Sequence, residues 1–385
     1  MATLKFKDSS LYKQENTAAP IEDYVYSRHV EDFEMQLKGN NNLIGIAVFG
    51  IGRAGTIHLT YLLRNPRVKV LYIVEQDKNK WNSIKSYWNV NDEVKFLDFD
   101  HADEVYKDKN VRAVIVTSPT KTHEDIVTKA LDHDKAVFCE KPIAENIEKT
   151  RKCFEKAKQI GQPLLTAFNR RFDAAFSSVK ERVGKGDVGH VNVIKTTSRD
   201  SPLPGIEYLK VSGGIFHDSA VHNIDTLIWI LREYPIKVSV AASANIPEIA
   251  EIGDFDTIVI LFTFPSGTLG IIDMCRYSNY GYDQRLEVFG FKGMLKVENQ
   301  QPLQGVESRS ENNRVCPIYY SFASRFQNSY VNEMDHFLNV VDGQEKLKVD
   351  YQDVLAVSKI ASACEEAAKT GKIVEIHWDS KDLPF

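Results

Sequence analysis

One short stretch of the chain carries acid–base side chains at helical spacing. Asp218 and His222 are four residues apart, and Asp225 follows His222 by three, so all three share one face of a helix. A carboxylate one turn from an imidazole can orient the ring and raise its basicity, and histidine titrates near neutral pH. The spacing allows His222 to be a general base held by Asp218. The alternative is an N-capping aspartate beside a buried, hydrogen-bonded histidine.

The residue types in this stretch also suit metal ions, because His217 directly precedes Asp218. Helical spacing of aspartate and histidine does not by itself make a metal site, however. The sequence has neither an HExxH motif nor a set of closely spaced cysteines. We therefore expect no bound metal.

Lys141 is a further candidate for chemistry, in the segment Glu140-Lys141-Pro142 after an expected strand. Ligands of open α/β sheets bind at the carboxyl ends of the strands. There the ammonium group of Lys141 can donate a hydrogen bond to a reacting oxygen and stabilise its negative charge. The alternative is a solvated lysine at a strand end. Two more polar segments follow expected strands, at 117–123 (TSPTKTH) and 169–172 (NRRF).

A glycine-rich turn predicts a dinucleotide site. The run Gly50-Ile51-Gly52-Arg53-Ala54-Gly55 follows a strand and opens a helix, which is the context that the GxGxxG fingerprint requires. Gly50 permits the tight turn, Gly52 lets the backbone approach a pyrophosphate, and Gly55 lets helix and strand pack closely. The phosphates then lie at the positive N-terminus of the helix.

The choice between the two nicotinamide cofactors depends on Glu75. This residue ends the second expected strand, 20 residues after Gly55, where an acidic side chain can bind a ribose diol and repel a 2′-phosphate. We therefore expect NAD. Three nearby basic residues leave NADP open as the alternative, namely Arg53, Lys78 and Lys80.

The elements that must hold these residues follow from hydrophobic periodicity. Between residues 43 and 168, short apolar strands are expected at 43–49, 68–74, 94–98, 111–117, 135–139 and 163–167. Helices are expected between most of them, at 55–65, 78–88, 121–132 and 144–160. Such alternation predicts right-handed βαβ units and a doubly wound Rossmann domain with a parallel sheet.

The remaining chain has a different pattern. Longer alternating strands are expected at 189–198, 236–245, 254–264, 267–275 and 284–290, with helices at 217–232, 325–341 and 351–370. This predicts an α+β domain over 169–385, with a large, mostly antiparallel sheet and helices on one face, for substrate binding and oligomerisation. Residues 1–42 are expected to be an N-terminal extension with a helix at 20–37, either a docked arm or an oligomer clasp.

Composition excludes several classes of protein. The 385 residues carry a net charge of −5, which argues against nucleic-acid and membrane-surface binding. No apolar run approaches the ~20 residues of a membrane span. The five cysteines are odd in number and scattered, so we expect a reducing, cytoplasmic environment rather than a disulfide framework. Cys139, beside Glu140, is expected to be a buried structural thiol.

Taken together, these segments resemble the Gfo/Idh/MocA family of nicotinamide-dependent oxidoreductases over about residues 43–376. Within the family, the run from Phe216 to Asp225 and the segment Tyr280-Gly281-Tyr282-Asp283 are most similar to the inositol 2-dehydrogenase branch. The resemblance implies a catalytic group of Lys141, Asp218 and His222, which also bind substrate together with Tyr280 and Tyr282. For the two tyrosines, the alternative is ordinary aromatics of a strand and of the core. To the glycine turn and Glu75 it adds cofactor contacts by Ser118, Pro119, His123, Glu140, Lys141 and Asn169, and it makes Arg170 a contact of the cofactor or the substrate.

The expected reaction is hydride transfer between NAD and a secondary alcohol of a cyclic polyol or sugar. His222 would accept the hydroxyl proton, Asp218 would hold the imidazole, and Lys141 would stabilise the developing alkoxide. Of Arg170 and Arg171, only one is expected to reach the site. The alternatives are an aldose, uronate or dihydrodiol substrate, or a nucleotide-binding regulator without activity. The resemblance also implies a homodimer or homotetramer.

Overall fold

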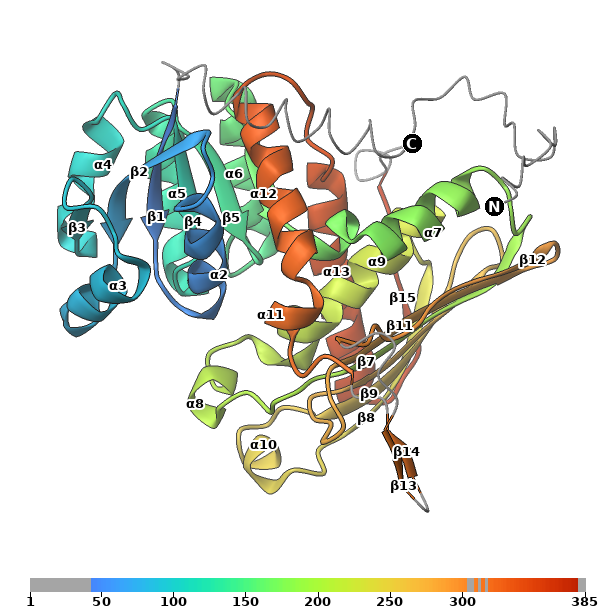
Figure 1. Cartoon of the computed structure of the whole chain (residues 1–385). Coiled ribbons are helices and arrows are strands. Elements are labelled where there is room, and N and C mark those ends of the chain that lie inside the picture. The colour runs from blue at the N-terminus through green and yellow to red at the C-terminus, as the bar shows by residue number, and fades with distance from the viewer. Residues whose placement is uncertain (1–42, 303–307, 311–312, 316–317, 380–385) are drawn as a thin grey trace, which may run out of the picture.

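The computed structural model describes residues 43–302, 308–310, 313–315 and 318–379. Two β-sheets with helices packed between and around them form the body of the molecule (Figure 1). The expected extension 1–42 with its helix at 20–37, the cysteine at position 316 and the C-terminal residues 380–385 lie outside the described residues.

The first sheet is parallel and has six strands in the order β3-β2-β1-β4-β5-β6. The strands are β1 (Ile44–Phe49), β2 (Val68–Val74), β3 (Lys95–Leu97), β4 (Ala113–Val116), β5 (Ala136–Glu140) and β6 (Leu164–Ala167). The helices of this region are α2 (Arg53–Leu62), α3 (Trp81–Trp88), α4 (Asp103–Lys107), α5 (His123–Asp132) and α6 (Ile147–Ile160). The strand order reverses between β1 and β4, where doubly wound folds bind their ligands.

Local sequence explains these elements. Strands β1 and β4 are buried along their whole length, and their continuous apolar runs fit a sheet covered on both faces. Helix α6 begins where the Asn146 side chain accepts a hydrogen bond from the Lys149 amide, and it ends at Gly161 in the left-handed conformation. The predicted doubly wound α/β architecture is confirmed.

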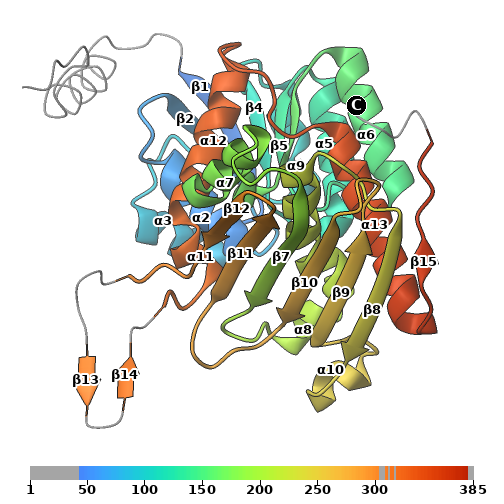
Figure 2. The same cartoon turned by 90° about the vertical axis from the view of Figure 1, so that its right-hand side faces the viewer.

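The second sheet has seven strands in the order β12-β11-β7-β10-β9-β8-β15 and is mixed, with β7 and β10 parallel and the other pairs antiparallel. Its strands are β7 (Val191–Arg199), β8 (Lys237–Ser243), β9 (Thr257–Thr263), β10 (Leu269–Cys275), β11 (Asp283–Gly290), β12 (Gly293–Val297) and β15 (Val374–Glu375). A separate hairpin pairs β13 (Ser308–Ser310) with β14 (Asn313–Val315). Helices lie behind the sheet in Figure 2, and the face toward the viewer is open.

The helices of this region are α7 (Ala174–Gly184), α8 (Ile206–Leu209), α9 (Val221–Leu231), α10 (Pro247–Glu251), α11 (Phe322–Arg325), α12 (Gln327–Val341) and α13 (Tyr351–Thr370). Periodicity located the main elements within a few residues, but it missed α7, the edge strands β12 and β15, and several short helices. The helix expected from residue 217 begins as a π-helix over Phe216–Ala220 before α9. Helix α12 packs against α2, which follows the first strand of the parallel sheet. Arg67, between α2 and β2, donates to the Asn339 side chain of α12 over 2.7 Å.

Two further properties concern only the part of the chain that the structure describes. Its four cysteines are free, and Cys139, Cys153 and Cys364 are buried. Burial raises the pKa of the Cys139 thiol well above its usual range, as the prediction of a structural thiol requires. None of the described helices is long and apolar enough to cross a membrane.

A buried ion network joins three segments that are distant in sequence. Arg171, in the short 3-10 helix η5 (Asn169–Phe172), donates to both oxygens of Asp225 on α9 and over 2.8 Å to Asp353 on α13. The side chains of Arg171 and Asp225 are 3% and 1% exposed. Buried charges tolerate removal of one partner poorly, because the remaining charge is left uncompensated.

We expect Asp225→Asn to lower the free energy of unfolding by about 3 kcal/mol, because Asp353 is then the one carboxylate left to Arg171 in this network. The matched control is Glu181→Gln, which breaks the exposed ion pair between Glu181 and Lys185 and should cost less than about 1 kcal/mol. Denaturant titration of the two variants tests this. Equal stability of both would show that the network does not hold α9 in place.

Candidate active site

A cleft of about 1790 Å³ opens at the carboxyl edge of the first sheet. It is also lined by residues of the second region, which follows β6 and holds the seven-stranded sheet. Most of the predicted site residues line it: Gly50, Gly52, Arg53, Ala54, Glu75, Ser118, Pro119, His123, Glu140, Lys141, Asn169, Arg170, Asp218, His222 and Tyr282. Three predicted residues do not line it, namely Ile51, Gly55 and Tyr280. The structure therefore gathers into one cavity side chains that are spread over more than 200 positions of the sequence.

The glycine turn has the geometry that a dinucleotide requires. Gly50 has φ +85°, and a Cβ there would lie 2.5 Å from the Cα of Ser118. A Cβ on Gly55 would lie 2.1 Å from the carbonyl oxygen of Gly50, so Gly55 is needed for helix packing rather than for ligand contact. A Cβ on Gly52 would meet nothing within 4 Å. The backbone at Gly52 is thus open to the cleft, and the turn fits a pyrophosphate.

Glu75 lies beside this turn at the end of β2. Its Oε2 accepts a hydrogen bond from the Ile51 amide over 2.8 Å, and its Oε1 accepts one from the Asp77 amide over 3.0 Å. The predicted ribose-binding carboxylate is therefore fixed in place and still lines the cleft. Ile51 contributes through its backbone amide, while its side chain lies in the core.

The loops after β4 and β5 are braced by His123. Its Nδ1 lies 2.7 Å from the carbonyl oxygen of Pro142, and its Nε2 lies 2.7 Å from that of Ser118. Burial lowers the pKa of this imidazole, against the hydrogen bonds to the two carbonyl oxygens, which raise it. His123 thus links the Ser118 loop to the Lys141 loop. Glu140 contacts helix α2, since its Oε1 lies 3.1 Å from Nε2 of the buried His58.

The neighbouring arginines point in different directions, and only Arg170 lines the cleft. Its Nη1 donates to Asn223 and its Nη2 to Gln284, each over 2.6 Å. Arg171 instead binds Asp225 in the network described above. The expectation that one of the two arginines reaches the site agrees with this arrangement.

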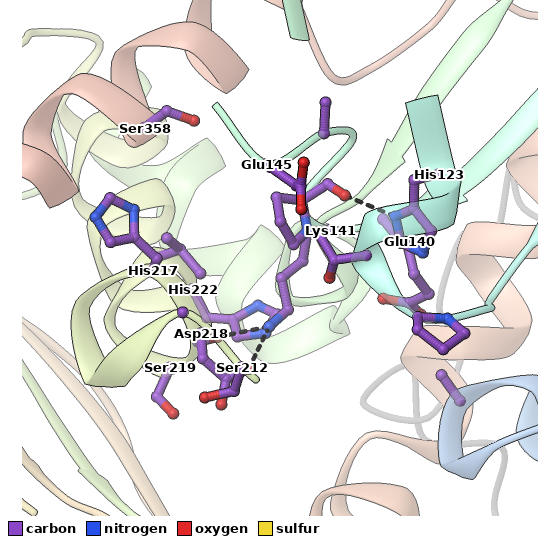
Figure 3. Close-up of a pocket in the computed structure, with 18 of the residues that line it drawn as sticks. His123, Glu140, Lys141, Glu145, Ser212, His217, Asp218, Ser219, His222 and Ser358 are labelled. Carbon is purple, nitrogen blue, oxygen red and sulfur yellow. Dashed lines mark hydrogen bonds and ion pairs between the residues drawn. The ribbon is translucent and has the colours of Figure 1, made fainter. Parts of the chain in front are cut away.

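Lys141 and Asp218 form the centre of the cleft (Figure 3). The Lys141 Nζ donates to the backbone carbonyl of Asp218 over 2.5 Å and lies 3.2 Å from its Oδ1. The same Oδ1 accepts a hydrogen bond from the Tyr208 hydroxyl over 2.8 Å, and Oδ2 accepts one from Arg276 Nη1 over 3.3 Å. Burial alone would raise the pKa of Asp218, but the charges of Lys141 and Arg276 outweigh it and hold this pKa below its usual range.

His222 does not form the predicted hydrogen bond with Asp218. Its Nδ1 is buried without a hydrogen-bond partner, while the Asp218 carboxylate binds the three donors named above. The π-helix between the two residues widens the turn, so four-residue spacing no longer stacks them as in an α-helix. Burial, and then the charges of Lys141 and Arg170, hold the pKa of His222 well below its usual range. The ring is therefore a neutral imidazole.

Two more residues of the run from His217 to Asp225 do not lie where their helical spacing placed them. Asp225 lies with Arg171 and not on the face of Asp218, and His217 is 3.3 Å from Glu365 on α13. Tyr280 is 58% exposed and donates to Asp283 over 2.7 Å. Among the described residues, no group of three or more histidines, cysteines and carboxylates could hold a metal ion.

Three residues of the cleft and its wall were missed by sequence reasoning: Asp200, Tyr208 and Arg276. Asp200 lines the cleft, and burial, reinforced by the nearby charge of Asp218, raises its pKa to about 6. Asp200 and Arg276 each follow directly after a strand, β7 and β10, and this position could have marked them. Tyr208 lies on the short helix α8, and no pattern in the sequence singles it out.

Comparison with known proteins agrees with this geometry. The model of the Gfo/Idh/MocA oxidoreductase family, NAD-binding Rossmann fold, matches residues 44–168, and the Gfo/Idh/MocA C-terminal domain model matches residues 176–296. Myo-inositol 2-dehydrogenase of Thermotoga maritima is 35% identical over 335 residues, which are 86% of this chain and 99% of that protein. Inositol 2-dehydrogenase of Rhizobium meliloti is 30% identical over 334 residues, 86% of this chain and 99% of that protein.

A solved structure shows the same architecture. Scyllo-inositol dehydrogenase from Lactobacillus casei, with bound NAD(H) and scyllo-inositol, superimposes with a TM-score of 0.80 at 26% identity. The match covers 86% of this chain and 99% of that structure. Both regions of the chain and both family models are included in these alignments, and the chain belongs to the Gfo/Idh/MocA family of oxidoreductases.

Proposed function

We propose that this protein is an NAD-dependent dehydrogenase that oxidises a secondary alcohol of a cyclic polyol, in the manner of an inositol 2-dehydrogenase. The observation that carries the proposal is the pairing of Lys141 with Asp218 beside the neutral His222, in the same cleft as the glycine turn. The inositol dehydrogenases among its relatives support a cyclitol as substrate.

The residues that would hold the cofactor are the glycine turn, Glu75 and the loops braced by His123. When bound, NAD supplies the hydride acceptor. The carboxylate of Glu75 at the end of β2 favours a ribose diol over a 2′-phosphate. Of the three basic residues that left NADP open, Lys78 does not line the cleft and is paired with Asp98 at 2.6 Å.

His222 is the base in the proposed reaction. A neutral imidazole can accept the hydroxyl proton of the substrate, and the low pKa keeps it neutral at physiological pH. Lys141 donates a hydrogen bond to the reacting oxygen and stabilises its negative charge. Asp218 holds the ammonium group of Lys141, not the imidazole as the sequence suggested. Arg170, Asp200 and Tyr282 line the cleft and offer polar contacts to further hydroxyl groups.

We also propose that the chain works as a homodimer or homotetramer through the open face of the second sheet. Apolar side chains on that sheet are exposed in a single chain: Val259, Leu261, Leu269, Phe289 and Met294 are 41–53% exposed. Exposed apolar surface of this kind marks an interaction site. Sedimentation equilibrium measures the mass directly, and a monomer at micromolar concentration would contradict the proposal.

The proposed division of the chain is an extension over 1–42, a Rossmann domain over 43–168 and an α+β domain over 169–385. The two sheets support a boundary near residue 168, between β6 and η5. Free cysteines in the described residues suit a reducing compartment, and we place the protein in the cytoplasm. Fractionation of cells that express the tagged chain tests this location.

The activity test is the absorbance of NADH formed by purified protein. We expect reduction of NAD by one inositol isomer from a panel of inositols, aldoses and uronates, with no effect of a chelator. Turnover of an aldose, uronate or dihydrodiol alone would move the substrate to another class of the same family. Absence of turnover with every alcohol, despite NAD binding, would favour a nucleotide-binding regulator.

We expect His222→Asn to lower kcat by about a hundredfold or more, because a general base is lost, while the Kd for NAD stays unchanged. Because the pKa of His222 lies well below 6.5, its protonation should not reduce wild-type turnover until the pH falls below that value. His190→Asn, at an exposed position, is the matched control. Near-normal turnover of His222→Asn would remove His222 from the mechanism.

A pair of glycine variants tests the cofactor turn. Gly52→Ala should raise the Kd for NAD about tenfold without changing the thermal midpoint, since the added Cβ meets only the open cleft. Gly55→Ala should lower the midpoint itself, because its Cβ would clash with the backbone of Gly50. Calorimetry and thermal unfolding separate the two effects. Wild-type NAD affinity in Gly52→Ala would show that the cofactor does not approach this turn.

A further inference from the structure

Tyr208 touches both the cofactor turn and the catalytic group. It lies on α8, in the second region of the chain, below the glycine-turn end of the first sheet in Figure 1. Its hydroxyl donates to Oδ1 of Asp218 over 2.8 Å. Its ring lies 4.3 Å from Cζ of Arg53, in cation–π contact. One side chain thus contacts Arg53 of the turn and Asp218 of the centre.

Arg53 is placed to respond to an anion in the turn. It follows Gly52 and is the first residue of α2, where a helix favours negative charge. Its guanidinium is also 5.8 Å from the ring of Phe322. Both aromatic partners belong to the second region of the chain, and both line the cleft. Arg53 therefore reaches from the first region to the second at the mouth of the phosphate site.

Arg276 binds the second oxygen of the Asp218 carboxylate, Oδ2, and holds it in place. The Arg276 side chain is fully buried and holds Asp254 over 2.9 Å as well as Oδ2 of Asp218 over 3.3 Å. With Oδ2 fixed in this way, the direction of Oδ1 is set by its two remaining partners, Lys141 and Tyr208. A hydroxyl that donates to a carboxylate makes a charge-assisted, strongly directional bond. Loss of that bond would leave Lys141 alone to orient Oδ1.

We propose that Tyr208 is a positioning residue that couples the dinucleotide site to the catalytic group. Its ring holds Arg53 at the phosphate turn, and its hydroxyl holds Asp218, and through it Lys141, in the orientation for reaction. The turnover part of this inference rests on the proposed dehydrogenase function. The binding part rests only on NAD affinity, which is measured without substrate.

Two variants separate the functions of ring and hydroxyl. Tyr208→Phe keeps the ring beside Arg53 and removes only the hydrogen bond to Asp218, so kcat should fall about tenfold or more while the Kd for NAD stays within twofold. Tyr208→Leu removes both contacts and should also raise the Kd for NAD about threefold to tenfold. Tyr87→Phe is the matched control, because Tyr87 is 80% exposed and outside the cleft.

The pH profile distinguishes positioning from packing. The Tyr208 hydrogen bond is one of the contacts that keep the pKa of Asp218 low, together with Lys141 and Arg276 and against burial. Without it, Asp218 protonates at higher pH. Protonation of Asp218 adds to that of His222 in the acid limb of kcat, so this limb should move to higher pH in Tyr208→Phe. A side chain with only a packing role would leave this limb in place.

The binding part is tested by a double-mutant cycle on NAD affinity with Tyr208→Leu and Arg53→Gln, using thermal unfolding to verify that each variant is folded. Coupled effects support the link, and independent, additive effects overturn it. Turnover of Tyr208→Phe within twofold of wild type, with an unchanged acid limb, would overturn the positioning of Asp218. Absence of wild-type turnover on any polyol would instead overturn the proposed function and leave the cycle as the test of the link.

Discussion

The ion pair between Lys141 and Asp218 is the contact on which the site depends. Lys141 follows the last residue of β5 in the parallel sheet, and Asp218 lies in the π-helix that leads into α9 of the second region. The bond therefore joins the two regions of the chain at the middle of the cleft. It fixes the ammonium group that would face a reacting oxygen, and it supplies a positive charge beside His222. This arrangement of charges keeps Asp218 ionised against its burial. It also reinforces burial, which is the main cause of the low pKa of His222.

The adjacent side chains of Arg170 and Arg171 have different roles, because they bind different partners. Arg171 is enclosed with Asp225 and Asp353, where the full ion network offsets the cost of desolvation and holds η5, α9 and α13 together. Arg170, the preceding residue, is bound by the neutral side chains of Asn223 and Gln284 and faces the cleft. Adjacent residues of a 3-10 helix point about a third of a turn apart. One arginine therefore stabilises the frame while the next lines the cleft.

Short side-chain contacts connect the glycine turn, the loops after β4 and β5, and Asp218 around the cleft. The glycine turn reaches Asp218 by way of Arg53 and Tyr208, and the loop of Ser118 reaches that of Lys141 by way of His123. Each link joins elements that belong to different loops or regions. In the proposed role of Tyr208, a ligand that orders the turn acts on Lys141 and Asp218 without touching them. Arg276 provides the fixed side of the arrangement, since it is held within the core between Asp218 and Asp254.

The sequence by itself determined the order of the elements, the parallel sheet and the open turn at Gly52, because periodicity and glycine spacing are local properties of the chain. It also located Lys141, Asp218 and His222 as chemically able residues. Only the tertiary structure decided how they pair. Asp218 binds Lys141, Tyr208 and Arg276, which are 77, 10 and 58 positions away, rather than the nearby His222. Such contacts depend on how the two sheets pack and on a π-turn that helical spacing does not encode, so the partners of a charge are settled only when the whole chain is folded.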